Sequence, residues 1–198
     1  MKNIRLTVWI GMMCGCLAAG MLQAGTRPDN ACPAEEDGSR LWLPVMRPAE
    51  GAEVEVIYKG KVSPTITIAI AELKNAWKGE PVLLEKKRTG QGDGFAITSS
   101  EHQVRILSST EAGLLYGVYS LLRMQAAGQV TVPLSVTEQP VYDLRILNHW
   151  DNPDGTVERG YAGRSLWNWE ELPGTLSPRY EAYARANASV GINGTVLN

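Results

Sequence analysis

A cluster of aromatic and polar side chains lies directly behind a short apolar run near position 147. The segment 148–152 reads Asn-His-Trp-Asp-Asn, and the segment 158–164 adds acidic, aromatic and basic residues. Indole, carboxylate, amide and guanidinium groups that follow a strand are typical of the wall of a ligand pocket. The sequence therefore predicts a binding site at the end of the strand that precedes His149.

A metal site is not expected in this cluster. Asp151, Asp154 and Glu158 suggest a calcium loop, but the glycine and the closing glutamate do not fall at EF-hand spacing. His149 is a potential ligand, yet His102 is the other histidine of the chain and lies in a different domain. A structural hydrogen bond is the favoured role for His149, and solvation in a turn is favoured for His102. We predict no metal and no cofactor.

The elements that position the cluster follow Pro140. Tyr142 to Leu147 is predicted to be a strand, Tyr180 to Ser189 a helix, and Thr195 to Leu197 the start of the next strand. A strand, a long loop, a helix and a strand form the opening unit of a (β/α) barrel, whose active site lies where strands run into loops. The chain stops at Asn198, so we expect residues 140–198 to be an incomplete start of such a barrel.

Residues 25–139 are predicted to form a separate α+β domain, a small sheet with packed helices. Strands are expected at 40–43, 54–58, 81–85, 95–98, 104–107 and 130–134. Helices are expected from Ser63-Pro64 to Gly79 and from Ser109 to Gly128, because capping residues precede apolar stripes that glycine closes. The glycines of Gly90–Gly94 favour a turn, since the lysine and hydroxyl of a phosphate loop are absent.

Residues 1–24 are predicted to be a secretory signal peptide. Lys2 and Arg5 precede an uncharged apolar run, and Ala24 is a small residue at a plausible cleavage point. A transmembrane anchor and lipidation at Cys16 are the alternatives. We expect an exported protein, periplasmic or extracellular, without a transmembrane span after cleavage and with Cys32 as its one thiol.

The composition is that of a globular protein without a strong electrostatic field. Apolar residues make up 44% of the chain and charged residues 20%, with a net charge of −2. No cluster of lysine and arginine alternates with aromatic residues, so nucleic acid is not an expected partner.

The runs 148–152, 158–163 and 183–198 resemble the family of xylan α-glucuronidases, of the glycoside hydrolase family 67 type. Gly92-Asp-Gly-Phe95 and 113–123 resemble the N-terminal domain of the same family. The resemblance implies a central (β/α)8 barrel and inverting hydrolysis that removes (4-O-methyl)glucuronic acid from xylo-oligosaccharides. Inversion needs a carboxylic acid and a carboxylate base about 6.5–9.5 Å apart. The family takes these from later barrel strands, so we expect no catalytic residue in this chain.

The resemblance also implies which residues bind substrate. Trp150 is expected to cover the face of the uronic acid, and burial in the seam between domains is its alternative. Asp151 and Asn152 are expected to contact hydroxyls or to shape the loop. Arg159 is expected to meet a carboxylate, with an ion pair to Glu158 or Asp154 as the alternative. Trp167 and Trp169 line the xylan side or pack under the loop, and a homodimer is a possible assembly of the full-length enzyme.

Two hypotheses about function remain. The first is the N-terminal part of a secreted α-glucuronidase that is inactive without the rest of its barrel. The second is a non-catalytic carbohydrate-binding or interaction module. The open strand edges of an unfinished parallel barrel favour the first.

Overall fold

A computed structural model describes Leu43, residues 54–88 and residues 92–197. The expected signal peptide, Cys16, Cys32 and most of the strand expected at 40–43 lie outside the described residues. None of the described helices has the length and apolar character needed to cross a membrane.

Five strands form one mixed sheet in the order β1-β2-β4-β3-β5. They are β1 (Val56–Tyr58), β2 (Val82–Lys86), β3 (Phe95–Ser99), β4 (Val104–Ser108) and β5 (Ser135–Glu138). β2 runs parallel to both β1 and β4, whereas β3 is antiparallel to both β4 and β5. The predicted hairpin of β3 and β4 is confirmed.

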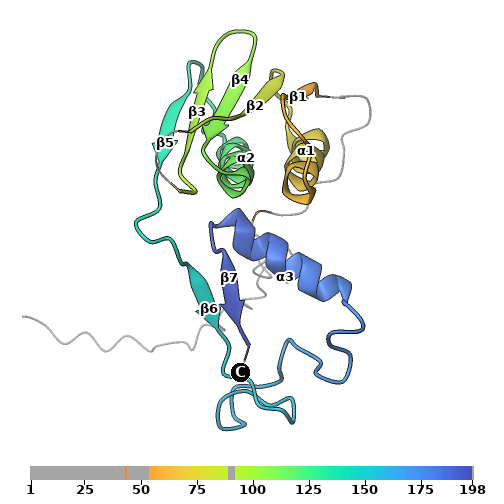
Figure 1. The fold of residues 1–198 in the computed structure, drawn as a ribbon. Coiled ribbons are helices and arrows are strands. Elements are labelled where there is room, and N and C mark those ends of the chain that lie inside the picture. The colour runs from red at the N-terminus through yellow and green to blue at the C-terminus, as the bar shows by residue number, and fades with distance from the viewer. Residues whose placement is uncertain (1–42, 44–53, 89–91, 198) are drawn as a thin grey trace, which may run out of the picture.

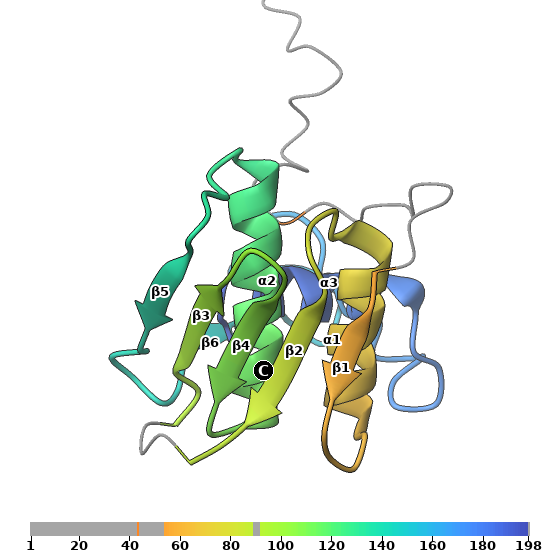
Figure 2. The ribbon, with the colours of Figure 1, turned by 90° about the horizontal axis from the view of Figure 1, so that it is seen from above.

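Helices α1 (Pro64–Ala76) and α2 (Glu111–Ala126) cover one face of this sheet (Figure 2). Both begin where the sequence predicts, because Ser63 and Thr110 are their N-caps. The Ser63 side chain accepts a hydrogen bond from the Ile66 amide at 3.3 Å, and Thr110 accepts one from the Gly113 amide at 2.9 Å. These bonds satisfy amides that the first turn of a helix leaves unpaired.

The core lies between the sheet and these two helices. Every second residue of β2 and β4 is buried on the helix side, as period-2 alternation requires. The helices contribute one apolar stripe each. Fully buried side chains are Ile66, Leu73, Val82, Leu84, Ile97, Ile106, Leu114, Val118, Leu121 and Leu122.

Two glycines allow α2 to lie very close to the sheet. A Cβ atom on Gly117 would lie 2.5 Å from Ile106 Cγ2. A Cβ atom on Gly113 would lie 2.1 Å from Ser108 Oγ and 2.8 Å from the carbonyl oxygen of Asp93. Real Cβ atoms do not approach other atoms this closely. The short distance between α2 and the sheet therefore requires glycine, which has no Cβ atom, at both positions.

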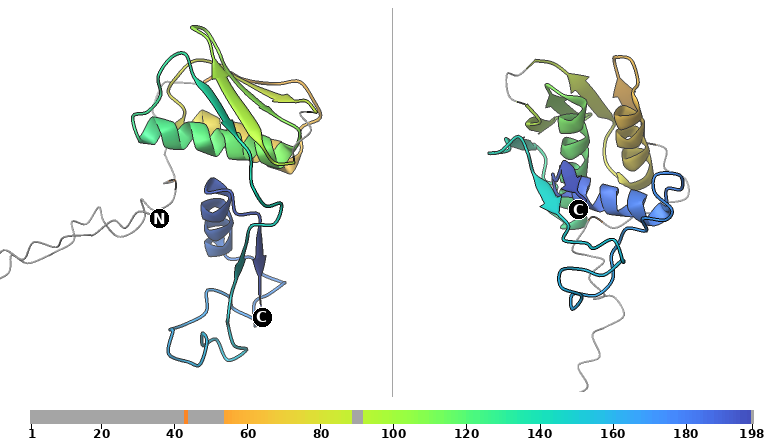
Figure 3. Two further views of the ribbon diagram at one scale, coloured as in Figure 1. Left: turned by 90° about the vertical axis from the view of Figure 1, so that its left-hand side faces the viewer. Right: turned by 60° about the horizontal axis from the view of Figure 1, so that its bottom comes forward.

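A second unit consists of β6 (Ile146–Asn148), α3 (Pro178–Ser189) and β7 (Gly194–Val196). β6 and β7 pair in parallel, so this is a strand, loop, helix and strand unit of the predicted order. Figures 1 and 3 show that α1 and α2 lie between the five-stranded sheet and this unit. One parallel pair occurs in barrels and in open sheets alike, so the barrel remains a prediction.

The strand predicted at 130–134 is wrong. This segment is a turn in which Val132 is 61% exposed, and the strand begins only at Ser135. Pro133 has no backbone N–H to donate to a sheet. The next amide, that of Leu134, donates instead to Ser99 Oγ at 2.6 Å.

The strand predicted at 142–147 begins later, at Ile146, and is therefore shorter. Tyr142 is 73% and Leu144 77% exposed. The carbonyl oxygen of Tyr142 accepts a hydrogen bond from Arg145 Nη1 at 2.8 Å. This segment therefore folds around the guanidinium of Arg145 instead of pairing with a strand.

Arg185 of α3 connects the second unit to α1. Its Nε and Nη2 atoms donate to the two carboxylate oxygens of Glu72 at 2.5 and 2.8 Å. Nη1 donates to the carbonyl oxygen of Leu43 at 2.6 Å, and the guanidinium lies 5.8 Å from the ring centroid of Tyr119. Desolvation and the Glu72 charge raise the pKa of the Tyr119 phenol, which therefore stays neutral.

Arg145 makes the second connection, to Tyr116 of α2 and to Asp93 before β3. Its Nη2 lies 3.2 Å from Asp93 Oδ2, and its guanidinium lies 5.5 Å from the centre of the Tyr116 ring. Its Nε donates to the carbonyl oxygen of Gly191 at 2.6 Å. Planar guanidinium groups suit such shared contacts, because they offer several donors in fixed directions.

The hydrogen bonds of Glu111 lead us to predict that stability depends on pH. Its carboxylate accepts hydrogen bonds from Ser63 Oγ at 2.5 Å and from Lys86 Nζ at 3.0 Å. These bonds lower the pKa of Glu111, that from Ser63 most. A lowered folded-state pKa adds stability above the unfolded pKa of about 4.3, and this stability is lost as the pH falls through the folded-state pKa. Glu111→Gln should therefore destabilise the chain at pH 7, and this difference should shrink as the pH falls through the folded-state pKa of Glu111.

Urea unfolding of both proteins between pH 7 and pH 3 checks this expectation. Glu101→Gln, in the exposed turn between β3 and β4, is the matched control. A difference between wild type and Glu111→Gln that stays constant over this range would contradict the assignment.

Candidate functional site

The predicted site residues lie in the loop that connects β6 to α3, at the carboxyl ends of the parallel strands. The His149 amide donates to the carbonyl oxygen of Val196 at 3.0 Å, which extends the pairing one residue past β6. Ligands of α/β folds bind at this end of parallel strands. The structure therefore places the cluster at the expected edge.

Trp150 presents an exposed indole at this edge. Thr195 of β7 faces α3, because its Oγ1 lies 2.9 Å from the hydroxyl of Tyr183. Leu147 is paired with Thr195, and His149 lies on the same side. Alternation places Trp150 on the side away from α3, and it is 62% exposed. Its indole is available as a flat binding face and is not buried in a domain seam among the described residues.

Asp151 is buried within the loop, with 6% of its surface exposed. One carboxylate oxygen accepts a hydrogen bond from Ser165 Oγ, and the other lies 3.7 Å from His149 Nδ1. This inward-facing carboxylate closes the loop through Ser165 and lies beside the imidazole of His149. It presents little of itself to a ligand.

Asn152 shapes the same loop. Its side-chain nitrogen donates to Thr156 Oγ1 at 2.8 Å and to the carbonyl oxygen of Glu158 at 2.7 Å. Both N–H donors of the amide are therefore occupied within the loop. The oxygen of the amide is the atom that remains for a ligand hydroxyl.

Arg159 lies exposed at the tip of the loop. Within the described part of the chain it has no ion pair, so the alternative partners Glu158 and Asp154 are not bonded to it. Hydrogen bonds from Thr156 lower the pKa of Asp154, and Arg164 adds to the effect. The Arg159 side chain is thus free to meet an anion, while the backbone of the neighbouring Glu158 is bonded to Trp150 and Asn152.

An aromatic cluster supports the loop from below. His149 Nε2 lies 2.6 Å from the Tyr183 hydroxyl, which is the structural hydrogen bond that the sequence favours. The ring of Trp167 lies 5.0 Å from that of Tyr180, 5.3 Å from that of Tyr183 and 5.5 Å from that of His149. The contacts with Tyr183 and His149 are edge-to-face, and that with Tyr180 is tilted. Contacts of this kind fix ring orientations. Trp167 therefore packs under the loop, while Trp169 is 37% exposed.

The arrangement combines an exposed indole, that of Trp150, with the buried carboxylate of Asp151. Asp151 is enclosed by its own loop, and the described residues give it no second carboxylate across an open space. Those residues also contain no group of three or more His, Cys, Asp or Glu side chains that could hold a metal ion.

Sequence reasoning missed the residues that hold the loop in place. Ser165 bonds to Asp151 from 14 positions away, and Tyr183 bonds to His149 from 34 positions away. Thr195 in turn bonds to Tyr183. Tyr183 carried a weak signal, because it lies on the predicted apolar side of its helix. Ser165 carried none.

The family comparison concerns the second half of the chain. Residues 124–198 match the family model described as glycosyl hydrolase family 67 middle domain, so this part of the chain is similar to that family.

Curated relatives carry the name of one enzyme. The chain is 40% identical over 107 residues to "Probable alpha-glucuronidase A" of Aspergillus clavatus and 43% identical over 107 residues to that of Neosartorya fischeri. It is 39% identical over 106 residues to "Alpha-glucuronidase A" of Aspergillus tubingensis. Each alignment covers 54% of this chain and 12% of the relative. The chain thus matches only a small part of each enzyme.

A solved structure supports the fold alone. A glycoside hydrolase family 138 enzyme that targets pectin rhamnogalacturonan II superposes with a TM-score of 0.54 at 14% identity. The match covers 73% of this chain and 24% of that enzyme. Part of that enzyme thus has a fold similar to that of this chain.

Proposed function

We propose that this chain is the N-terminal portion of an exported α-glucuronidase that removes (4-O-methyl)glucuronic acid from xylan-derived oligosaccharides with inversion. Residues 25–139 would be its N-terminal α+β domain and residues 140–198 the start of its catalytic barrel. The observation that carries the proposal is the exposed indole of Trp150 at the carboxyl end of a parallel strand pair, within the family 67 match.

The open side of β6 and β7 supports the barrel. Ile146 is 48% and Val196 39% exposed, and both lie on the side of the pair that faces away from α3. A parallel strand pair is ordinarily covered on both faces, and α3 covers only one. Further strands of a barrel would cover the apolar side and surround Trp150.

The catalytic acid and base are proposed to lie outside this chain. An inverting enzyme needs two carboxyl groups with room for water between them. Trp150 and Arg159 would form part of the wall that binds the uronic acid, while Asp151 and Asn152 hold the loop in shape. A homodimer and a periplasmic or extracellular location belong to the same proposal.

The test is Trp150→Ala in a longer protein that contains this chain and the remaining barrel. Loss of the stacking face should lower kcat/KM for release of uronic acid from aldouronic oligosaccharides by several-fold to a few hundredfold, about 1–3 kcal/mol. Tyr161→Ala is the matched control, because Tyr161 is 75% exposed in the same loop. Release of reducing uronic acid measures the rate.

The 198-residue chain provides the second arm of this test. It should release no uronic acid, since the proposal places both carboxylates elsewhere. Turnover by the chain alone would contradict that placement, and unchanged kinetics of Trp150→Ala would contradict the role of the indole.

A further inference from the structure

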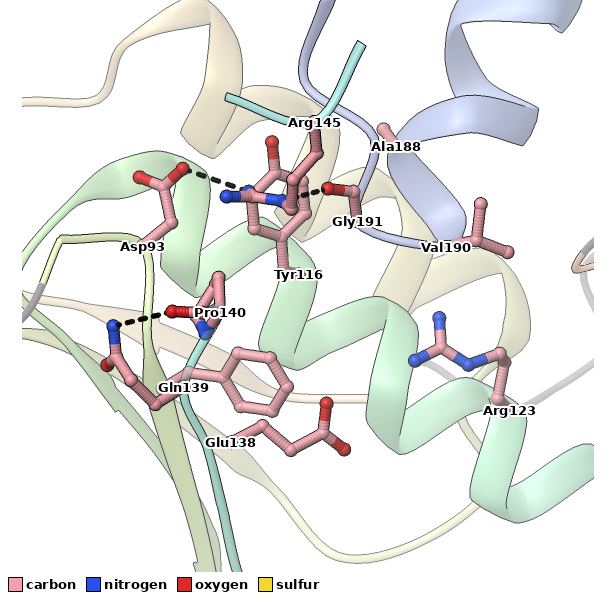
Figure 4. A pocket seen from close by; sticks show the side chains of 11 residues that line it. Asp93, Tyr116, Arg123, Glu138, Gln139, Pro140, Arg145, Ala188, Val190 and Gly191 are labelled. Atoms are coloured by element: carbon pink, nitrogen blue, oxygen red, sulfur yellow. Dashed lines mark hydrogen bonds and ion pairs between the residues drawn. The ribbon is translucent and has the colours of Figure 1, made fainter. Parts of the chain in front are cut away.

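A hollow lies away from the Trp150 edge, between the sheet layer and the second unit. It has a volume of about 310 Å³ and is bordered by α2, the end of β5 and the turn after α3. This is at the lower end of the range of about 300–1,000 Å³ that small-molecule sites occupy. Figure 4 shows the side chains that surround it.

Arg123, in the last turn of α2, is the group in this hollow that lacks partners. The part of the chain that the structure describes provides no hydrogen bond and no ion pair for its guanidinium. It is half-buried, and burial lowers the pKa of Arg123. A guanidinium carries five N–H donors, and leaving them unpaired in a partly buried place is costly. Arg145 in the same hollow, by contrast, has its donors occupied.

Glu138 lies opposite Arg123, and the two side chains point toward one another across the hollow (Figure 4). They interact through space but form no ion pair. One oxygen of Glu138 accepts a hydrogen bond from Ser120 Oγ at 3.2 Å. A donor fork and an acceptor thus face each other with a gap between them.

The balance of charge favours a neutral ligand. Arg123 and Glu138 offset one another, and Arg145 is paired with Asp93, so the hollow has no excess charge that would attract an ion. Adjacent hydroxyls can accept from one side and donate to the other, which fits a donor and an acceptor that are held apart.

Apart from Gln139, the remaining side chains around the hollow are mostly apolar. Phe95, Tyr116, Pro140, Ala188 and Val190 border the hollow. A pyranose ring presents C–H groups on its faces and hydroxyls at its rim. Apolar walls with a few fixed polar groups are the usual surroundings of such a ligand.

We propose that this hollow binds a neutral pyranose unit, with Arg123 donating to and Glu138 accepting from adjacent hydroxyl groups. The pyranose unit would belong to the oligosaccharide substrate or to a neighbouring polysaccharide chain, and it would bind at a place separate from Trp150. The proposal rests on the proposed function only for the choice of a xylose oligomer as probe.

Titration of the 198-residue chain with xylotriose, followed by NMR of backbone amides and arginine Nε–Hε groups, tests the proposal. We expect shifts of the Arg123 side chain and of residues around Glu138, with a dissociation constant on the order of 1 mM. Arg123→Gln should weaken binding at least tenfold. Arg179→Gln, the same change on an exposed arginine of α3, should not.

Two further variants separate this proposal from the proposed function. Trp150→Ala should leave the Arg123 shifts unchanged, and Glu138→Gln should weaken them. Shifts that vanish in Trp150→Ala but persist in Arg123→Gln would overturn the second site while leaving the Trp150 proposal intact. Tighter binding of glucuronate than of xylotriose at Arg123 would overturn the assignment to a neutral ring. If xylotriose binding depends on Arg123 but the full-length protein lacks uronidase activity, this proposal holds and the proposed function fails.

Discussion

Arg185→Ala is expected to lower the free energy of unfolding by about 2–4 kcal/mol. Breaking a buried ion pair costs about 3–5 kcal/mol, because the remaining charge is left without a partner. The side chains of Arg185 and Glu72 are 18% and 14% exposed, so solvent reduces this cost somewhat. The variant also loses the bond to the Leu43 carbonyl oxygen. Urea unfolding measures the change.

A double-mutant cycle makes the test specific. Glu72→Ala alone should cost a similar amount, and the double variant should cost much less than the sum, because no unpaired charge remains. Arg179→Ala on the exposed side of α3 is the control for the loss of an arginine. Additive effects of the two changes would show that the pair does not hold α3 to α1.

Gly113→Ala is expected to destabilise the chain by about 2 kcal/mol, although alanine is the better helix former. Helix propensity alone would favour alanine by up to about 1 kcal/mol. The new Cβ would lie 2.8 Å from the carbonyl oxygen of Asp93, which is backbone and cannot rotate away. Forcing α2 outward costs about 1–3 kcal/mol and can cost more.

Gly174→Ala is the matched control for this change. A Cβ there meets only the carbonyl oxygen of Glu171, at an ordinary contact distance of 3.5 Å. Urea unfolding should therefore show a clear loss for Gly113→Ala and little change for Gly174→Ala. A stabilised Gly113→Ala would show that α2 has room to move away from the sheet.

Local signals in the sequence predicted most of the elements. Ser63, Thr110 and Pro64 mark the helix starts, because caps act within one turn. Alternating burial in β2 and β4 follows from period 2. The predictions for 130–134 and 142–147 were wrong because apolar residues suggested strands where the backbone cannot pair. Pro133 removes a ladder donor, and Arg145 draws the carbonyl of Tyr142 out of any strand.

The site was predictable in its location and not in its internal contacts. A run of aromatic and polar residues after a strand indicates the edge at which Trp150 lies. The inward turn of Asp151 depends on Ser165, 14 residues later in the chain. The connection of Arg185 with Glu72 joins residues 113 positions apart. Such contacts are set by how elements pack, which no local pattern encodes.

The two arginine connections can form only late in synthesis at the ribosome. Their acceptors, Glu72 and Asp93, belong to the sheet layer, while both guanidiniums come from the segment that is translated afterwards. The sheet layer therefore emerges before Glu72 and Asp93 can meet their arginine partners, and with an uncovered helix surface on α1 and α2. Docking of the next unit neutralises both carboxylates at once, so the first layer acts as a template for the nascent chain that follows it.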